Sequence, residues 1–154
     1  MTQPNLNIVP FVSVAPMMKL VLSVGVETFP KPLADYLEED LRRWDSFDKP
    51  PRVDSQSDEA VIELMPTSDG TMYGFKYVNG HPKNTRDGLQ TGTAFGVLSD
   101  VGSGYPMLLT EMTILTALRT AATSAVAAKH LAPKNARTRA IIGNGEQSEF
   151  QAWG

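Results

Sequence analysis

The sequence predicts an α/β protein in which an α+β portion is followed by the first strand and turn of a doubly wound parallel sheet. Three observations lead to this prediction. Apolar residues recur at helical spacing in residues 32–47, short apolar runs alternate with turn residues in 60–109, and an apolar run enters a Gly-x-Gly turn in 137–150. We expect a first domain over residues 1–134 and the start of a second over residues 135–154.

The N-terminal part is expected to hold a strand, a loop and one amphipathic helix. Residues 8–26 are apolar but are interrupted by Pro10 and Pro16, so they predict strand and loop rather than a signal peptide. Residues 32–47 predict a helix because one face is apolar and the other is charged. The apolar face consists of Leu33, Tyr36, Leu37, Leu41 and Trp44.

Strands and turns alternate in the middle of the chain. Residues 48–58 contain two prolines and several polar side chains, which predicts a loop. The predicted strands are residues 60–65, 72–78, 93–98 and 105–109. The first two should form an antiparallel hairpin, because Ser68, Asp69 and Gly70 supply turn chemistry between them. Residues 79–89 are rich in Asn, Gly and Pro and predict a second loop.

A long helix is predicted over residues 110–131. Thr110 is expected to cap this helix, and Glu111 is expected to interact with the positive end of the helix dipole. Pro133 ends the helix. The run from Ala140 to Ile142 has no polar alternation, as expected of a parallel strand that is covered on both faces.

The turn after that strand has the chemistry of a dinucleotide-binding site. Gly143 allows a tight bend, Gly145 lets the backbone approach a pyrophosphate, and the N-terminus of the following helix offers N–H groups to the anion. Position 148, where the pattern prefers a third glycine, is serine. The acidic residue that would bind the ribose is expected about 20 residues further on, beyond Gly154, so the pattern does not distinguish NAD from NADP.

The amino-acid composition limits the kinds of molecule that this chain is expected to bind. The net charge is −3, and no run of Lys and Arg indicates nucleic acid or an anionic membrane as a partner. No apolar stretch reaches the roughly 18 residues of a membrane span. The chain has no cysteine, and its two histidines, His81 and His130, lack a second ligand at metal spacing. These features predict a small-molecule partner and no metal site, and they are compatible with a cytoplasmic location.

Four charged residues occur in surroundings that are unusual for a charge. Lys76 lies in the centre of a predicted strand, where it is either an edge-strand lysine in solvent or a contact for an anionic ligand. Arg119 has small, apolar or hydroxylated neighbours, so it is expected to be buried and to pair either with an internal acid or with a bound carboxylate or phosphate. Arg52 follows two prolines and Glu63 lies inside an apolar strand, and each alone is compatible with a structural role.

Long runs of the sequence carry a family resemblance. They are VIELMP, FKYVNGHPKNT, TAFGVLSDVGSGYPMLLTEMT, ALRTAATSAVAAKHLA and IIGNGEQSEFQA, between residues 52 and 152. With these runs the chain resembles the ornithine cyclodeaminase/mu-crystallin family. The resemblance implies a homodimer whose subunits have an α+β substrate and dimerisation domain followed by an NAD-binding Rossmann domain. It also implies the conversion of L-ornithine to L-proline and ammonia, in which NAD takes a hydride from Cα and the same hydride returns to a cyclic imine.

The resemblance assigns roles to individual residues. Arg52, Lys76 and Arg119 fall where the family binds the substrate carboxylate, and Glu63 matches an acid of the same pocket that orders a water or the substrate amine. The family contacts NAD at the positions of Thr91, Arg119, Glu146 and Gln147, beside Gly143 and Gly145. Glu146 stands where a small residue is usual in the family, and an acid beside a pyrophosphate is electrostatically unfavourable.

Alternatives to this activity stay open. The catalytic aspartate of the family is expected beyond Gly154, so residues 1–154 are expected to be an N-terminal portion that is inactive alone. A related imine reductase or amino-acid dehydrogenase of the family would share the carboxylate site. A non-enzymatic role as a ligand-binding or dimerising domain is the alternative from a different class.

Overall fold

The computed structural model describes residues 8–153, which cluster into two compact units. The first unit contains Asp45–Thr113 together with the described part of Met1–Pro16. The second unit contains Met17–Trp44 and the described part of Ile114–Gly154, so its helices come from two separate parts of the sequence. The domain boundary predicted at residue 134, where Pro133 ends a helix and a polar link follows, stays a prediction.

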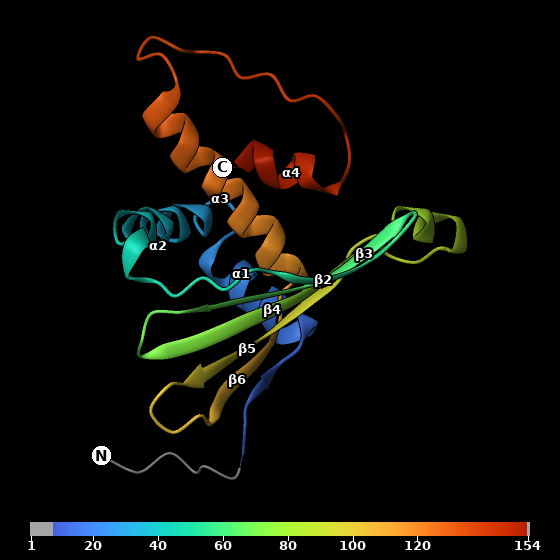
Figure 1. The fold of residues 1–154 in the computed structure, drawn as a ribbon. Coiled ribbons are helices and arrows are strands. Elements are labelled where there is room, and N and C mark those ends of the chain that lie inside the picture. The colour runs from blue at the N-terminus through green and yellow to red at the C-terminus, as the bar shows by residue number, and fades with distance from the viewer. Residues whose placement is uncertain (1–7, 154) are drawn as a thin grey trace. The chain divides into compact units, whose positions relative to one another are not determined.

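Within the described residues, the first unit is built on a six-stranded sheet (Figure 1). The strands lie in the order β1-β6-β5-β4-β3-β2. β1 pairs with β6 in parallel, and all other neighbours pair antiparallel. The strands are β1 (Phe11–Val12), β2 (Val53–Ser57), β3 (Ala60–Ser68), β4 (Met72–Gly80), β5 (Ala94–Asp100) and β6 (Pro106–Glu111). The mixed fold class, its mainly antiparallel sheet and the four strands predicted in it are therefore confirmed.

The hairpin of β3 and β4 forms where the turn residues predict it. Asp69 accepts hydrogen bonds at Oδ1 from the backbone N of Thr71 (2.9 Å) and of Met72 (2.8 Å). Gly70 has a φ of +87°, a conformation that residues with a Cβ rarely adopt. These local interactions fix the register of two nine-residue strands that carry candidate site residues.

The predicted loop over residues 48–58 is wrong in its second half, which forms β2. Val53 of β2 pairs with Leu64 of β3, and Ser57 pairs with Ala60. Every residue of β2 is exposed, so the strand has no buried face and its sequence has no apolar alternation. Backbone pairing with β3, rather than side-chain burial, forms this edge strand.

Most of the second unit is helical (Figure 1). The described helices are α1 (Val14–Val24), α2 (Pro30–Arg42), α3 (Thr113–Leu131) and α4 (Glu146–Trp153). α2 confirms the helix predicted over residues 32–47, and the end of that segment forms the short 3-10 helix η1 (Trp44–Ser46). None of the helices in the described part of the chain has the length and apolar character needed to cross a membrane.

The interpretation of residues 8–26 as strand and loop is wrong for most of the segment, because α1 occupies it. Pro16 is the third residue of this helix. A proline in the first turn costs no hydrogen bond, because the first N–H groups of a helix have no partner within it. Met17 and Val21, one turn apart, are the buried residues of the helix.

α3 begins later than predicted. Thr110 and Glu111 belong to β6, so Thr110 does not cap the helix. Glu111 nevertheless lies at the helix N-terminus, because its Oε2 accepts a hydrogen bond from the backbone N of Thr113 (2.9 Å). The buried residues of α3 are Ala117, Leu118, Ala121, Ala122 and Val126.

Residues 140–142 do not form the predicted parallel strand. Ile142 is fully exposed, and no strand of the described residues pairs with this segment. A parallel strand needs neighbours to pair its backbone and to cover its faces, and the described part of the chain supplies none here. The helix predicted after the glycine turn is confirmed as α4.

Candidate functional site

One face of the sheet carries two of the charged residues that the sequence singled out. Residues directly opposite each other in an antiparallel pair point to the same face, as do residues two apart along a strand. Glu63 pairs with Val78, and Met65 pairs with Lys76. Glu63 and Lys76 therefore share one face of the sheet, which we call the charged face.

Arg52 joins the charged face through an ion pair. Its Nη1 donates a hydrogen bond to Oε1 of Glu63 at 3.2 Å. The Arg52 side chain is 64% exposed, and the Glu63 side chain is 24% exposed. An exposed pair of this kind contributes about 0–1 kcal/mol. Glu63 therefore orients the guanidinium without preventing Arg52 from binding an anionic ligand.

Lys76 lies in an interior strand and not at an edge. β4 lies between β3 and β5, and Lys76 pairs with Met65 on one side and with Gly96 on the other. The residue is half-buried. The alternative of an edge-strand lysine in solvent is therefore wrong, and the contact with an anionic ligand stays a prediction.

Gly96 leaves room beside Lys76 for the side chain of Met112. A Cβ on Gly96 would overlap Sδ of Met112 and would lie 3.1 Å from the backbone O of Phe75. The backbone N of Met112 donates a hydrogen bond to Ala94 O at 2.8 Å, which continues the pairing of the two strands past the end of β6. The thioether therefore forms an apolar wall on the charged face. Sequence reasoning missed this pair, although a glycine inside a strand often marks such a close approach.

Thr91, a predicted NAD contact, lies at a cavity of about 440 Å³ in the first unit. The cavity is lined by Asn79, Gly80, His81, Pro82, Thr91 and Gly92. Thr91 is exposed, and its backbone O accepts a hydrogen bond from the backbone N of His81 at 2.7 Å. The loop predicted over residues 79–89 contains the short 3-10 helix η2 (Pro82–Asp87) and brings His81 beside Thr91.

Arg119 is exposed, which contradicts its predicted burial. Successive helix residues are about 100° apart, so Arg119 falls beyond the edge of the buried stripe around Leu118 and Ala121. The prediction failed because small residues surround Arg119 on every side, and they do not show which side is covered. Arg119 belongs to the second unit, so its meeting with the substrate carboxylate stays a prediction.

The Gly-x-Gly turn leaves open space around both of its glycines. Gly143 has a φ of +110°, and a Cβ on either Gly143 or Gly145 would meet nothing within 4 Å, so the space around the turn is open. Ser148 closes the turn by donating hydrogen bonds to Gly145 O from its backbone N (2.8 Å) and its Oγ (2.7 Å). Glu146 and Gln147 are the first residues of α4. The N-terminus of this helix therefore fits an anion, although Glu146 adds a negative charge there.

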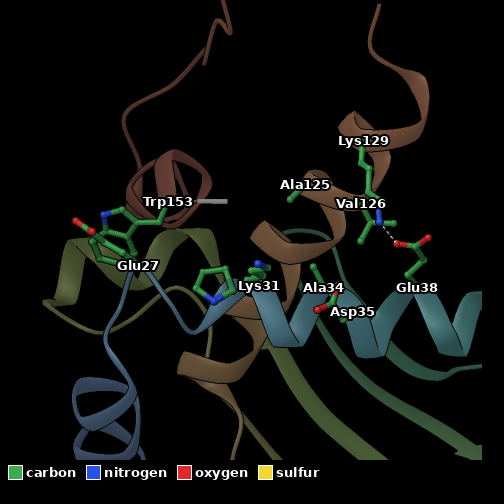
Figure 2. A pocket seen from close by; sticks show the side chains of 10 residues that line it. Glu27, Lys31, Ala34, Asp35, Glu38, Ala125, Val126, Lys129 and Trp153 are labelled. Atoms are coloured by element: carbon green, nitrogen blue, oxygen red, sulfur yellow. Dashed lines mark hydrogen bonds and ion pairs between the residues drawn. The ribbon is translucent and has the colours of Figure 1, made fainter. Parts of the chain in front are cut away.

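The second unit has its own cavity of about 340 Å³, lined by Glu27 and by residues of α2, α3 and α4 (Figure 2). Figure 2 shows Lys129 of α3 reaching Glu38 of α2, with Nζ 2.6 Å from Oε2. Arg42 (2.8 Å) and His130 (3.2 Å) also contact the Glu38 carboxylate. The hydrogen bonds from Lys129 and then from Arg42 lower the pKa of Glu38 from 4.5 to about 2. None of the predicted site residues lines this cavity, so we interpret the cluster as a structural link between α2 and α3.

Solved structures with this fold include enzymes that act on amino acids. A lysine cyclodeaminase structure, described for its recognition of L-lysine, L-ornithine and L-2,4-diaminobutyric acid, matches with a TM-score of 0.85 and 28% identity over 94% of this chain and 44% of that chain. An archaeal alanine dehydrogenase dimer with bound NAD matches with a TM-score of 0.79 and 28% identity over 94% of this chain and 43% of that chain. This chain therefore has the fold of the corresponding part of these two enzymes.

The chain belongs to the ornithine cyclodeaminase/mu-crystallin family, whose profile matches residues 14–153. The ornithine cyclodeaminase of Brucella abortus biovar 1 (strain 9-941) is 87% identical over 152 residues, which are 99% of this chain and 42% of that protein. The chain thus spans less than half the length of the curated relatives that it matches. The family resemblance seen in the sequence is confirmed.

Proposed function

We propose that this chain is part of an ornithine cyclodeaminase, which converts L-ornithine to L-proline and ammonia with the help of NAD. The observation that carries the proposal is the 87% identity with the Brucella abortus enzyme over 99% of this chain. The charged face supports it, because cations bind the carboxylate that every amino-acid substrate carries, and Arg52 and Lys76 both belong to the first unit.

Arg52 and Lys76 are proposed to bind the substrate carboxylate. A guanidinium offers a planar pair of donors that matches a carboxylate, and an ammonium adds a compact charge. Arg119 of α3 is proposed as the third cation of this site. Holding the carboxylate fixes the position of the reacting Cα atom, which is the main contribution that such residues make to a rate.

Glu63 is proposed to have two roles. One carboxylate oxygen, Oε1, accepts the hydrogen bond from Arg52 and so sets the orientation of the guanidinium. A carboxylate has further acceptor positions on its second oxygen, and these are proposed to order a water or the substrate amine. Met112 beside Lys76 would exclude water from one side of the bound substrate.

The dinucleotide is proposed to bind at the turn between Gly143 and Gly145, where the first turn of α4 offers N–H groups to the pyrophosphate. The proposed contacts also include Thr91, Arg119, Glu146 and Gln147. When bound, NAD would accept a hydride from Cα of the amino acid and return it to the cyclic imine. The protein residues bind, orient and shield the substrate during these steps.

We further propose that residues 1–134 act as the substrate and dimerisation domain and that residues 135–154 begin the Rossmann domain. The homodimer is supported by the dimeric alanine dehydrogenase with the same fold. A cytoplasmic location is compatible with a chain that has no cysteine.

A product assay on the complete native protein tests the proposal. L-ornithine should give proline and ammonia with no net reduction of NAD. Lys76→Met keeps the side-chain stem but removes the charge, and it should raise the KM for ornithine about 10- to 100-fold. Lys83→Met, which removes a half-exposed lysine of η2 in the same unit, is the matched control and should leave KM unchanged.

Other products would identify the alternatives. Net reduction of NAD with release of a 2-oxo acid would identify an amino-acid dehydrogenase, an alternative that the similarity to the archaeal alanine dehydrogenase favours. Reduction of an added cyclic imine, with no use of ornithine, would identify an imine reductase. If the protein neither converts ornithine nor retains NAD, the non-enzymatic role is favoured.

A further inference from the structure

A hydrogen-bond network at the end of β4 holds the segment that contains Thr91. Asn79 accepts two hydrogen bonds at Oδ1, from the backbone N of Thr93 (2.7 Å) and from its Oγ1 (2.6 Å). The backbone N of Asn79 donates to Thr93 O (3.1 Å), and the backbone N of His81 donates to Thr91 O (2.7 Å). Both ends of the segment from Thr91 to Thr93 are therefore attached to Asn79 and His81.

The orientation of the Asn79 amide follows from its partners. The backbone N–H of Thr93 can only donate, so the atom facing it must be the oxygen Oδ1 of Asn79. The amide nitrogen Nδ2 therefore faces His81, whose Nδ1 lies 3.2 Å away. Nδ2 can only donate, so Nδ1 of His81 is the acceptor in this contact. Each member of the network thus has one defined role.

This network borders the cavity that contains Thr91. Asn79, His81 and Thr91 all line the cavity of about 440 Å³. Asn79 and His81 are half-buried, whereas Thr91 is exposed. The exposed residue is the one predicted to touch the cofactor, and the two half-buried residues line the same cavity and are hydrogen-bonded to its segment. This is the arrangement of a contact residue with supporting residues that hold its backbone.

We propose that Asn79 and His81 are positioning residues that fix the Thr91–Thr93 segment for contact with the dinucleotide. The inference rests on the proposed function, because Thr91 is a cofactor contact only if the protein binds NAD. Neither residue needs to touch the cofactor itself. The His81 ring holds the Asn79 amide, which in turn holds Thr93, so loss of either side chain would release the segment at Thr93, two residues from Thr91. The bond from the His81 backbone N to Thr91 O would remain, and the altered segment would place Thr91 less well for contact with the cofactor.

The test measures the affinity of the complete native protein for NAD alone by calorimetry. His81→Leu removes the acceptor at Nδ1, and it should weaken NAD binding about three- to tenfold. His81→Asn places an amide oxygen near the position of Nδ1 and should restore the affinity to within about twofold of the native value. The KM for ornithine should change less than the affinity for NAD in both variants.

Two further variants separate positioning from general damage. Thr93→Val removes the Oγ1 donor to Asn79 but keeps the backbone donor, so it should weaken NAD binding to an extent similar to His81→Leu. Thr85→Val removes a similar hydroxyl hydrogen bond in η2, from Oγ1 to Pro82 O at 3.3 Å, and should leave NAD affinity unchanged. Exchange of the Thr93 amide hydrogen should be faster in His81→Leu than in the native protein and slow again in His81→Asn.

The outcomes distinguish this inference from the proposed function. If the native protein and His81→Leu bind NAD equally well, the positioning role of Asn79 and His81 is overturned, and the proposed function stands. Equal weakening by His81→Leu, His81→Asn and Thr85→Val would also overturn it, because the effect would then be general. Native protein that does not bind NAD would overturn the proposed function and this inference with it.

Discussion

Gly96→Ala is expected to destabilise the protein through one identified contact. The new Cβ would overlap Sδ of Met112 and would lie 3.1 Å from the backbone O of Phe75. The thioether has to move until its sulfur lies about 3.5 to 4 Å from the new carbon, and the Phe75 carbonyl has little freedom because it belongs to β4. Overpacking of this kind costs about 1 to 3 kcal/mol. A displaced thioether would also disturb Lys76, the cross-strand partner of Gly96, so the KM for ornithine should rise.

The measurement is thermal unfolding of the complete native protein and its variants. Gly74→Ala is the matched control, because its Cβ would lie 3.5 Å from Val97 O and 3.8 Å from Leu98 Cδ1, which are ordinary contacts. The thermal unfolding midpoint of Gly74→Ala should stay unchanged or rise slightly, since alanine loses less conformational entropy on folding than glycine does. Adding Met112→Ala to Gly96→Ala should recover part of the loss, with a coupling of about 1 kcal/mol. Equal midpoints for Gly96→Ala and Gly74→Ala, or strictly additive effects in the double variant, would refute the packing argument.

Three further predictions concern single side chains. Glu63→Gln should change the free energy of unfolding by less than about 1 kcal/mol, because the Arg52–Glu63 pair is exposed. The same variant should raise the KM for ornithine severalfold in steady-state kinetics. Arg119→Ala should weaken ornithine binding by about 2 kcal/mol in calorimetry, and unchanged binding would reject its role at the carboxylate. The pKa of Glu38 is lowered to about 2, so its stabilising effect is complete above pH 4.5 and lost as the pH falls toward 2. Glu38→Gln should therefore flatten the acid-unfolding curve in that range, and an unchanged curve would contradict the role of its partners.

Local signals predicted the parts of the fold that depend on local interactions. The β3–β4 hairpin follows from Asp69 and Gly70, whose turn chemistry is visible in the sequence and present in the structure. β2 was missed because an exposed edge strand depends on pairing with a distant segment and has no apolar alternation. α1 was missed because Pro16 usually interrupts a helix, but in the first turn it costs no hydrogen bond.

The candidate site was also predictable only in part, because part of it depends on contacts between segments that are distant in sequence. Lys76 was recognised because a charge in the middle of a strand is unusual, and the sheet order then showed that its strand is interior. The predicted burial of Arg119 was wrong, because the alanine-rich sequence around it does not show which face of the helix is covered. Asn79 was overlooked because its partner Thr93 is distant in sequence, although the Asn-Gly-His-Pro run was visible.

We propose that the complete protein binds an amino acid by its carboxylate, so that a hydride leaves Cα and returns to the same carbon. The most direct test supplies the complete native protein with NAD and L-ornithine that carries deuterium at Cα, and measures the label in the product by mass spectrometry. The proline should retain the deuterium at Cα, one ammonia should form per proline, and NADH should not accumulate. Loss of the label with accumulation of NADH, or no conversion of ornithine to proline, would contradict it.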